Sequence, residues 1–71
     1  MKRPFRLYDS KTKKFLFGRN YGYKERAHIG ALIQVRWAAV GTVIEVIDAS
    51  ISKMIGQYKR GVNDIKFMKG D

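Results

Sequence analysis

The chain has 71 residues, of which 45% are hydrophobic and 13% aromatic, so its composition is that of one small folded domain rather than a disordered segment. It contains no cysteine, which excludes a disulfide framework and a thiolate metal site. The formal net charge is +9, and residues 1–26 hold nine of the fifteen Lys and Arg residues but two of the six acidic ones. This asymmetry favours a polyanionic partner, although basic charge that only keeps a small protein soluble is the alternative interpretation.

The N-terminal segment predicts neither secretion nor membrane insertion. Its charged residues are not followed by an apolar stretch of the kind a signal peptide needs. The longest uncharged apolar segment, residues 37–44, is too short to span a bilayer. We therefore expect a cytoplasmic protein that has no membrane partner.

The first predicted element is a β-hairpin. Residues 4–9 alternate apolar and polar side chains, as a half-buried strand does, and residues 14–20 return as the second strand. The polar residues between them form the loop, in which the Asp9 carboxylate is placed to accept backbone N–H groups in an Asx-turn.

A helix is predicted from about residue 24 to residue 40, where Gly41 would end it in the left-handed conformation. This helix is apolar on two faces. One face holds mainly alanines, and the other holds the larger side chains of Ile29, Ile33, Trp37 and Val40. Because one sheet covers one face, the larger side chains either fill the core or form an exposed stripe. In the second case we expect Ile29, Ile33 and Trp37 to form an interface with a protein partner or a second copy.

Two further strands, residues 42–48 and 53–59, are predicted to form a second hairpin, and residues 61–71 are expected to be a tail. The sequence thus predicts an α+β domain of two layers, an antiparallel sheet and one helix in the order β-β-α-β-β, with an ordered core of about residues 4–60. Both hairpins place an Asp, four loop residues and a Lys in the same register, as seen at Asp9 and Asp48. A shared turn geometry explains this match, whether it arose by internal duplication or by chance.

No catalytic constellation is visible in the sequence. His28 is the only histidine, so a transition-metal site would need an unusual set of carboxylates, and we expect a packed or half-exposed imidazole instead. The serines lie in predicted loops, the carboxylates form no pair spaced for acid–base work, and no glycine-rich phosphate loop is present. We therefore expect no enzymatic activity, no catalytic or metal-ligating residue, no cofactor and no small-molecule substrate.

The first segment instead interleaves cationic and aromatic side chains. Cations hold phosphates and aromatic rings stack on bases, so nucleic acid is the partner that this mixture favours, although the tyrosines could equally pack on the helix while the lysines are solvated. The leading prediction is a small basic nucleic-acid-binding or accessory module that uses the first hairpin. The residues expected to bind nucleic acid are Arg3, Arg6, Lys11, Lys13, Lys14 and Arg19.

Residues 24–48 also resemble small bacteriophage-encoded proteins of strand-strand-helix-strand layout, which include an inhibitor of bacterial RNA polymerase and some anti-CRISPR proteins. The resemblance rests on Glu25, Ala27, Trp37, Gly41 and the strand 43–47. It implies a protein that occupies a surface on a larger host machine, and it transfers no site residue. The alternative function is thus a phage-type protein-interaction factor that inhibits or redirects a host enzyme such as RNA polymerase or a CRISPR complex.

Overall fold

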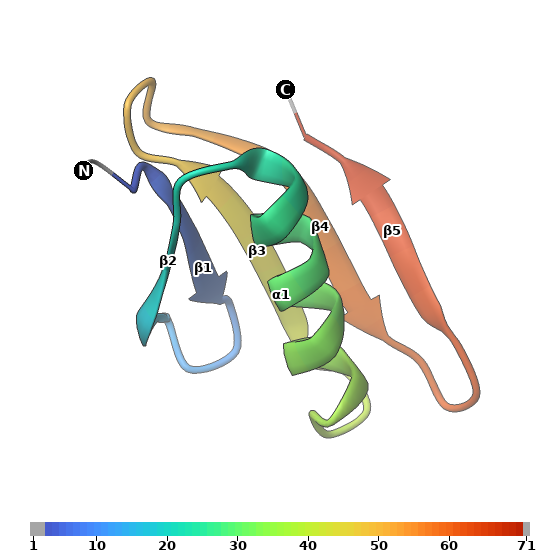
Figure 1. The fold of residues 1–71 in the computed structure, drawn as a ribbon. Coiled ribbons are helices and arrows are strands. Elements are labelled where there is room, and N and C mark those ends of the chain that lie inside the picture. The colour runs from blue at the N-terminus through green and yellow to red at the C-terminus, as the bar shows by residue number, and fades with distance from the viewer. Residues whose placement is uncertain (1–2, 71) are drawn as a thin grey trace.

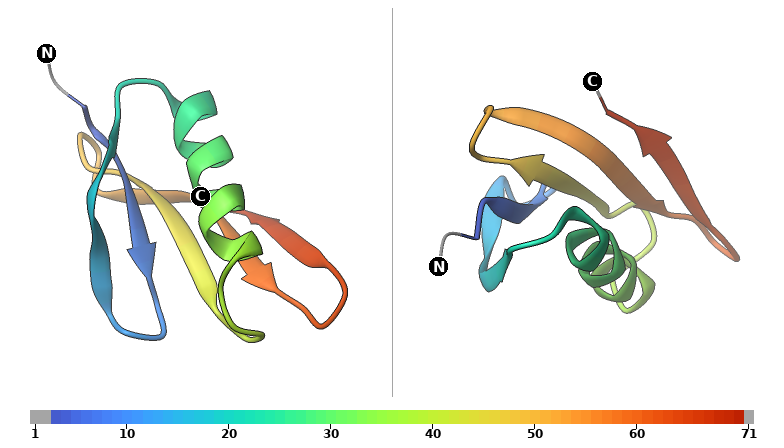
Figure 2. Two further views of the ribbon diagram at one scale, coloured as in Figure 1. Left: turned by 60° about the horizontal axis from the view of Figure 1, so that its bottom comes forward. Right: turned by 45° about the horizontal axis from the view of Figure 1, so that its top comes forward.

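The structure, a computed structural model, describes residues 3–70 as a sheet with one helix packed across it (Figure 1). The strands lie side by side in the order β2-β1-β3-β4-β5, and all neighbouring pairs are antiparallel. The helix covers one face of the sheet and leaves the other face open (Figure 2). The predicted two-layer α+β architecture is therefore confirmed. The elements are β1 (Phe5–Asp9), β2 (Lys14–Tyr21), α1 (Lys24–Arg36), β3 (Val43–Asp48), β4 (Lys53–Arg60) and β5 (Ile65–Lys69).

The two hairpins on either side of α1 have the same turn geometry. In each hairpin a paired Asp and Lys enclose four loop residues, 10–13 in the first and 49–52 in the second. The carboxylate of Asp9 accepts the N–H of the residue two positions later at 2.9 Å, and that of Asp48 does the same at 3.0 Å. The last loop residue is left-handed in both, with φ of 58° at Lys13 and 53° at Ser52. The predicted Asx-turn and the shared turn geometry are both confirmed.

The β1–β3 ladder relates the two hairpins by a local two-fold arrangement. Leu7 pairs with Val46 at its centre, and the pairs Phe5–Asp48 and Asp9–Ile44 stand at equal distances on either side. Asp9 and Asp48 are thus equivalent positions. Because neighbouring strands run in opposite directions, the tips of the two hairpins lie at opposite ends of the sheet (Figure 1).

The segment expected to be a tail contains a fifth strand, β5, so the order β-β-α-β-β was incomplete. β5 pairs with β4, and it places Phe67 opposite Tyr58. A tight turn joins β4 to β5, so the two paired strands are close in sequence. In this turn the N–H of Gly61 donates to the carbonyl of Asp64 at 2.8 Å. Only Ile65 and Phe67 keep the alternation that signals a strand, because the order of Met68 and Lys69 reverses it.

The helix ends at Arg36, four residues before the predicted end, and Gly41 has a different role from the expected one. The N–H of Ala38 bonds to the carbonyl of Val35 in a tighter turn, which closes the helix. Gly41, with φ of 94°, is the third residue of a β-turn in which the N–H of Thr42 donates to the carbonyl of Ala39. A positive φ at this position favours glycine, so the glycine serves the entry into β3.

The core lies between α1 and the three central strands, and small residues form the buried face of the helix. Leu7, Ile44 and Val46 fill the layer from the sheet side, so α1 must approach closely. The structure therefore shows the second of the two predicted outcomes for α1, in which the larger side chains face outward. No helix within residues 3–70 is long and apolar enough to cross a membrane. The buried helix residues are Ala27, Gly30, Ala31 and Val35.

Candidate nucleic-acid interface

The six basic residues expected to bind nucleic acid are all exposed, but they form two groups rather than one patch. The three lysines Lys11, Lys13 and Lys14 lie at the tip of the β1–β2 hairpin. Hydrogen bonds hold this tip in place, because the backbone N–H and the hydroxyl of Ser10 both donate to the carbonyl of Val43. The arginines lie farther along the same hairpin, beyond the Tyr8–Phe15 pair.

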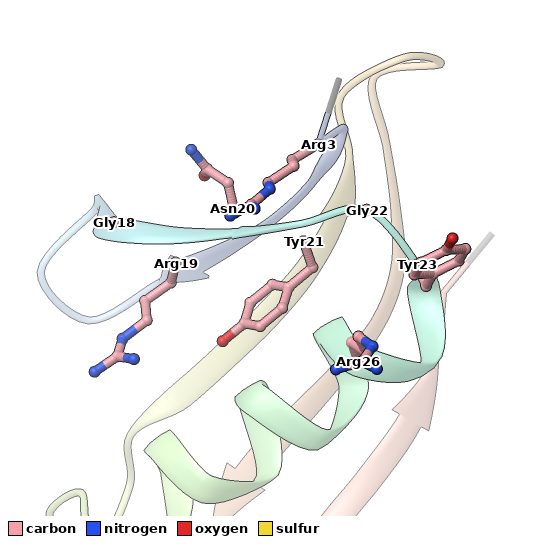
Figure 3. Close-up of a pocket in the computed structure, with 8 residues that line it drawn as sticks. All are labelled: Arg3, Gly18, Arg19, Asn20, Tyr21, Gly22, Tyr23 and Arg26. Atoms are coloured by element: carbon pink, nitrogen blue, oxygen red, sulfur yellow. The ribbon is translucent and has the colours of Figure 1, made fainter. Parts of the chain in front are cut away.

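A hollow of about 430 Å³, the basic hollow, brings two of these arginines together with a third one that the sequence analysis did not include. Arg3 and Arg19 line it together with Arg26, which extends from the first turn of α1 (Figure 3). Two tyrosines, Tyr21 and Tyr23, complete its wall. No acidic residue is among the lining residues, so the three guanidinium groups favour an anionic ligand.

The position of Arg19 follows from an irregularity in β2. The ladder shifts between the Tyr8–Phe15 pair and the Arg6–Asn20 pair, so β2 has more residues than β1 over this stretch. Gly18 accommodates the extra length with φ of 77°, a value that favours glycine. Bulges of this kind redirect side chains, and here Arg19 extends from the same side of β2 as Tyr21 (Figure 3).

The face of the sheet that α1 leaves open carries a second candidate surface, the open face. Strand pairing aligns one row of side chains across all five strands, and aromatic rings begin that row. The rings of Tyr8 and Phe15 meet edge to face, with their centroids 5.0 Å apart, and Phe15 is 53% exposed. Arg6 lies in the adjacent row. The aligned row is Phe15, Tyr8, Glu45, Gln57 and Met68.

Two cations of the open face were missed by the sequence analysis. Lys59 and Lys66 pair directly across β4 and β5, beside Val43 of β3. Neither was predicted as a binding residue, since β5 was not expected and so Lys66 had no place on the sheet. Glu45 is the one acidic residue among the paired residues of this face. The open face therefore combines cations with stacking surfaces, as single-strand binding sites do.

The predicted partner-interface residues form one exposed stripe along the outer side of α1. Ile29, Ile33 and Trp37 are 59%, 52% and 82% exposed, and they are spaced four residues apart, so they follow one line along the helix. The structure thus brings these three residues together. With Leu32, which is also exposed, they form the helix stripe: Ile29, Leu32, Ile33 and Trp37. Val40 lies outside the stripe, in the turn after the helix, where it lines a hollow with Lys59 and Val62.

His28 is half-buried, as expected, and it attaches α1 to β4 and β5. Its Nδ1 lies 3.0 Å from the hydroxyl of Tyr58, and its ring meets Phe67 edge to face. Burial first, and then the positive charge of Lys24, lower the pKa of His28 below its ordinary value of 6.5. Burial raises the pKa of Tyr58 above 10.0. Within residues 3–70, no three His, Asp or Glu side chains are grouped so that they could hold a metal ion.

Comparison of the chain with protein-family models, curated proteins and solved structures finds no match. The similarity to phage-encoded proteins thus stays a prediction from the pattern of residues 24–48. The physical basis for a function lies in three surfaces of the molecule: the basic hollow, the open face and the helix stripe.

Proposed function

We propose that this chain is a non-enzymatic nucleic-acid-binding module that holds single-stranded nucleic acid along β1 and β2. The observation that carries the proposal is the basic hollow, whose lining has three arginines and two tyrosines and no acidic residue. Guanidinium groups bind phosphate oxygens through paired hydrogen bonds, and tyrosine rings stack on bases. The same small region thus offers both of the contacts that a nucleotide chain needs.

Two features favour a single strand over a duplex. The rings of Tyr8 and Phe15 lie on an open sheet face, where unpaired bases can stack and paired bases cannot. The apolar helix stripe runs along the exposed side of α1, whose cations are confined to its first and last turns, so this side is unsuited to a groove lined with phosphates. A helix that reads the major groove would present polar and cationic side chains on that side.

The lysines at the tip of the first hairpin extend the cationic surface toward the other end of β1. Lys11, Lys13 and Lys14 are exposed, the first two on the hydrogen-bonded loop and the third at the start of β2. Contacts of this kind hold phosphates without reading sequence, and each one releases counterions. Arg19 and Tyr21 lie on the helix side of the sheet and Tyr8 and Phe15 on the open face, so the proposed nucleic-acid strand passes around the edge strand β2. The proposal assigns affinity to the lysines and arginines and base stacking to the exposed aromatic rings.

The proposal is tested by fluorescence anisotropy with a labelled single strand of about 20 nucleotides and a duplex of the same sequence. Binding is expected to be tighter for the single strand and to weaken steeply as salt rises from about 50 mM to about 500 mM, with a log–log slope of roughly −0.7 per phosphate contacted. No binding of either probe at about 50 mM salt, where electrostatic attraction is strong, would reject nucleic acid as the ligand.

The local two-fold arrangement supplies a matched control for the site. Lys14 and Lys53 begin the second strand of their hairpins, and both are exposed, so Lys14→Ala and Lys53→Ala remove the same charge from equivalent positions. We expect Lys14→Ala to reduce the salt slope by roughly 0.7, and Lys53→Ala to leave it almost unchanged. Equal effects would mean that total charge, and not the first hairpin, determines binding.

A second pair of variants separates stacking from charge. Phe15→Ala removes an exposed ring without changing charge, so we expect it to weaken single-strand binding by roughly 1–3 kcal/mol and to leave the salt slope unchanged. Arg3→Ala combined with Arg19→Ala is expected to lower both affinity and slope. If Phe15→Ala has no effect, the bound strand does not lie on the open face.

The second candidate function is the phage-type interaction factor, and the exposed helix stripe is the observation that favours it. A stripe of large apolar side chains commonly marks a contact with another protein. Affinity capture from a bacterial lysate, with and without nuclease, distinguishes the two candidates. A stoichiometric protein partner that survives nuclease but is lost with Trp37→Ala would support the interaction factor, whereas recovery of nucleic acid alone would eliminate it.

A further inference from the structure

The helix stripe leaves four large apolar side chains in contact with solvent along one side of α1 and at its C-terminal end. Trp37 is the extreme case, since 82% of its surface is exposed at the C-terminal end of the helix. The exposed parts of the four side chains amount to roughly 450 Å² of apolar surface, a size that in monomers commonly marks a functional contact. The stripe contains no charged residue.

A hollow of about 260 Å³, the stripe hollow, lies beside the N-terminal half of the stripe, between α1 and β2. The ring of Tyr21 and the side chains of Ile29 and Ile33 form its apolar wall, and Arg26 stands at its rim. Gly30 also lines the hollow, and a Cβ atom at this position would overlap the Tyr21 hydroxyl. The fold thus has an apolar socket at one end of the stripe and an exposed indole at the other.

We infer that a second copy of this chain covers the helix stripe in an antiparallel, two-fold arrangement, with Trp37 of each copy seated in the stripe hollow of the other. The residue spacing carries this geometry. Ile29 stands four residues before Ile33, and Trp37 stands four residues after it. When two such helices pack antiparallel with Ile33 on the axis, Trp37 of one copy lies opposite Ile29 of the other.

The chemistry of the two ends supports the same pairing. An indole buries well against the Tyr21 ring and the two isoleucines, and the guanidinium of Arg26 can lie over the indole face as a cation–π partner. The two-fold axis creates this contact twice. Burying the stripes of both copies removes roughly 900 Å² from solvent, which is the size of a weak, reversible interface, so we expect a dissociation constant in the micromolar range or weaker.

Charge gives the dimer a diagnostic salt dependence. Each copy has a formal charge of +9, so the association of two copies brings like net charges together. Salt screens this repulsion, whereas it does not weaken apolar contacts. Association of two copies is therefore expected to tighten as salt rises, which is the opposite of nucleic-acid binding. Arg26 and Tyr21 line both the basic hollow and the stripe hollow, but the two associations respond to salt in opposite directions, so the failure of one is distinguishable from the failure of the other.

The test is sedimentation equilibrium of the nuclease-treated full chain at concentrations from about 1 μM to about 1 mM, combined with tryptophan fluorescence. Trp37 is the only tryptophan, so its emission reports the interface directly. We expect a monomer–dimer equilibrium that tightens between about 50 mM and about 500 mM salt, and a shift of the emission to shorter wavelength as the dimer forms. A chain that stays monomeric at about 1 mM in high salt overturns the inference.

Variants then locate the interface. Trp37→Ala and Ile33→Glu are expected to weaken dimerisation at least tenfold, since one removes the seated side chain and the other places like charges on the axis. Val62→Glu is the matched control, because Val62 is 73% exposed in the β4–β5 turn and lies outside the stripe. Circular dichroism confirms that each variant is folded. A dimer that persists in Ile33→Glu, or that dissociates equally in Val62→Glu, overturns the arrangement.

Discussion

Leu7 and Val46 face each other across the β1–β3 ladder, and neither exposes any surface to solvent. They stand at the centre of the local two-fold arrangement, so each hairpin contributes one of them to the same point of the core. Because α1 contributes small side chains to this layer, these two residues supply much of its apolar volume.

Leu7→Ala is therefore expected to destabilise the domain by about 2–5 kcal/mol, the range for cavities in fully packed cores. Urea denaturation followed by circular dichroism measures the change. Ile51→Ala serves as the control, since Ile51 is 56% exposed on the second hairpin loop and its truncation should change stability by less than about 0.5 kcal/mol. A loss below about 1 kcal/mol for Leu7→Ala would contradict the described core.

Gly56 stands at the point where two rings meet above β4. A Cβ at this position would lie 2.9 Å from both the Cε1 of His28 and the Cε1 of Phe67, which is closer than packed carbons approach. We expect Gly56→Ala to cost about 1–3 kcal/mol through overpacking, measured by urea denaturation. Gly22→Ala is the matched control, because nothing lies within 4 Å of its Cβ. Equal stabilities of the two variants would show that the His28–Phe67 packing is not maintained in solution.

Ser52 has a left-handed backbone, with φ of 53°, as the last residue of the second hairpin loop. This conformation costs a non-glycine residue about 1–2 kcal/mol, and glycine removes that strain. Glycine also has more conformational freedom in the unfolded chain, which offsets part of the gain in stability. Ser52→Gly is therefore expected to raise the midpoint of thermal unfolding, with a gain of about 0.5–1 kcal/mol. Ala49→Gly lies in the same loop without a left-handed backbone, so it should lower stability. A loss with Ser52→Gly would contradict the turn geometry.

His28 makes stability depend on pH. Because its folded-state pKa lies below the unfolded value of 6.5, the unfolded chain binds more protons between these two values. The contribution of His28 to stability is therefore complete above pH 6.5 and is lost as the pH falls through the folded-state pKa. We expect the melting temperature of the wild type to fall between about pH 7 and about pH 5, and that of His28→Gln to fall less. Parallel curves for the two proteins would contradict a neutral, half-buried His28.

The strands that flank α1 could be predicted because their signals are local. Alternating side chains set the strand positions, and Asp9 and Asp48 mark the turns, so the predicted bounds differ from the observed ones by at most one residue. β5 could not be predicted in the same way, since its lysines interrupt a short apolar alternation. Its place in the sheet depends on β4 as a neighbour, and this is a tertiary relationship.

The buried face of α1 was likewise not determined by helical periodicity. Both faces are apolar, and the choice depends on how much volume Leu7, Ile44 and Val46 already fill. The exposure of the six basic residues was predictable from charge, but their division into two groups was not. That division follows from the register of the hairpin and from the bulge at Gly18. The open face could not be predicted either, because the sequence does not indicate which side of the sheet α1 covers.

The opposed hairpin tips give the molecule a polarity that its symmetric backbone does not have. The first tip carries three lysines, whereas the four loop residues of the second tip are uncharged and lie beside Arg3 and Arg6. The two ends of the sheet therefore differ in the kind of cation that they present, amines at one end and guanidinium groups at the other. For the proposed nucleic-acid ligand, we expect this difference to favour one orientation, because planar guanidinium groups hold phosphates through paired hydrogen bonds while lysines attract them as point charges.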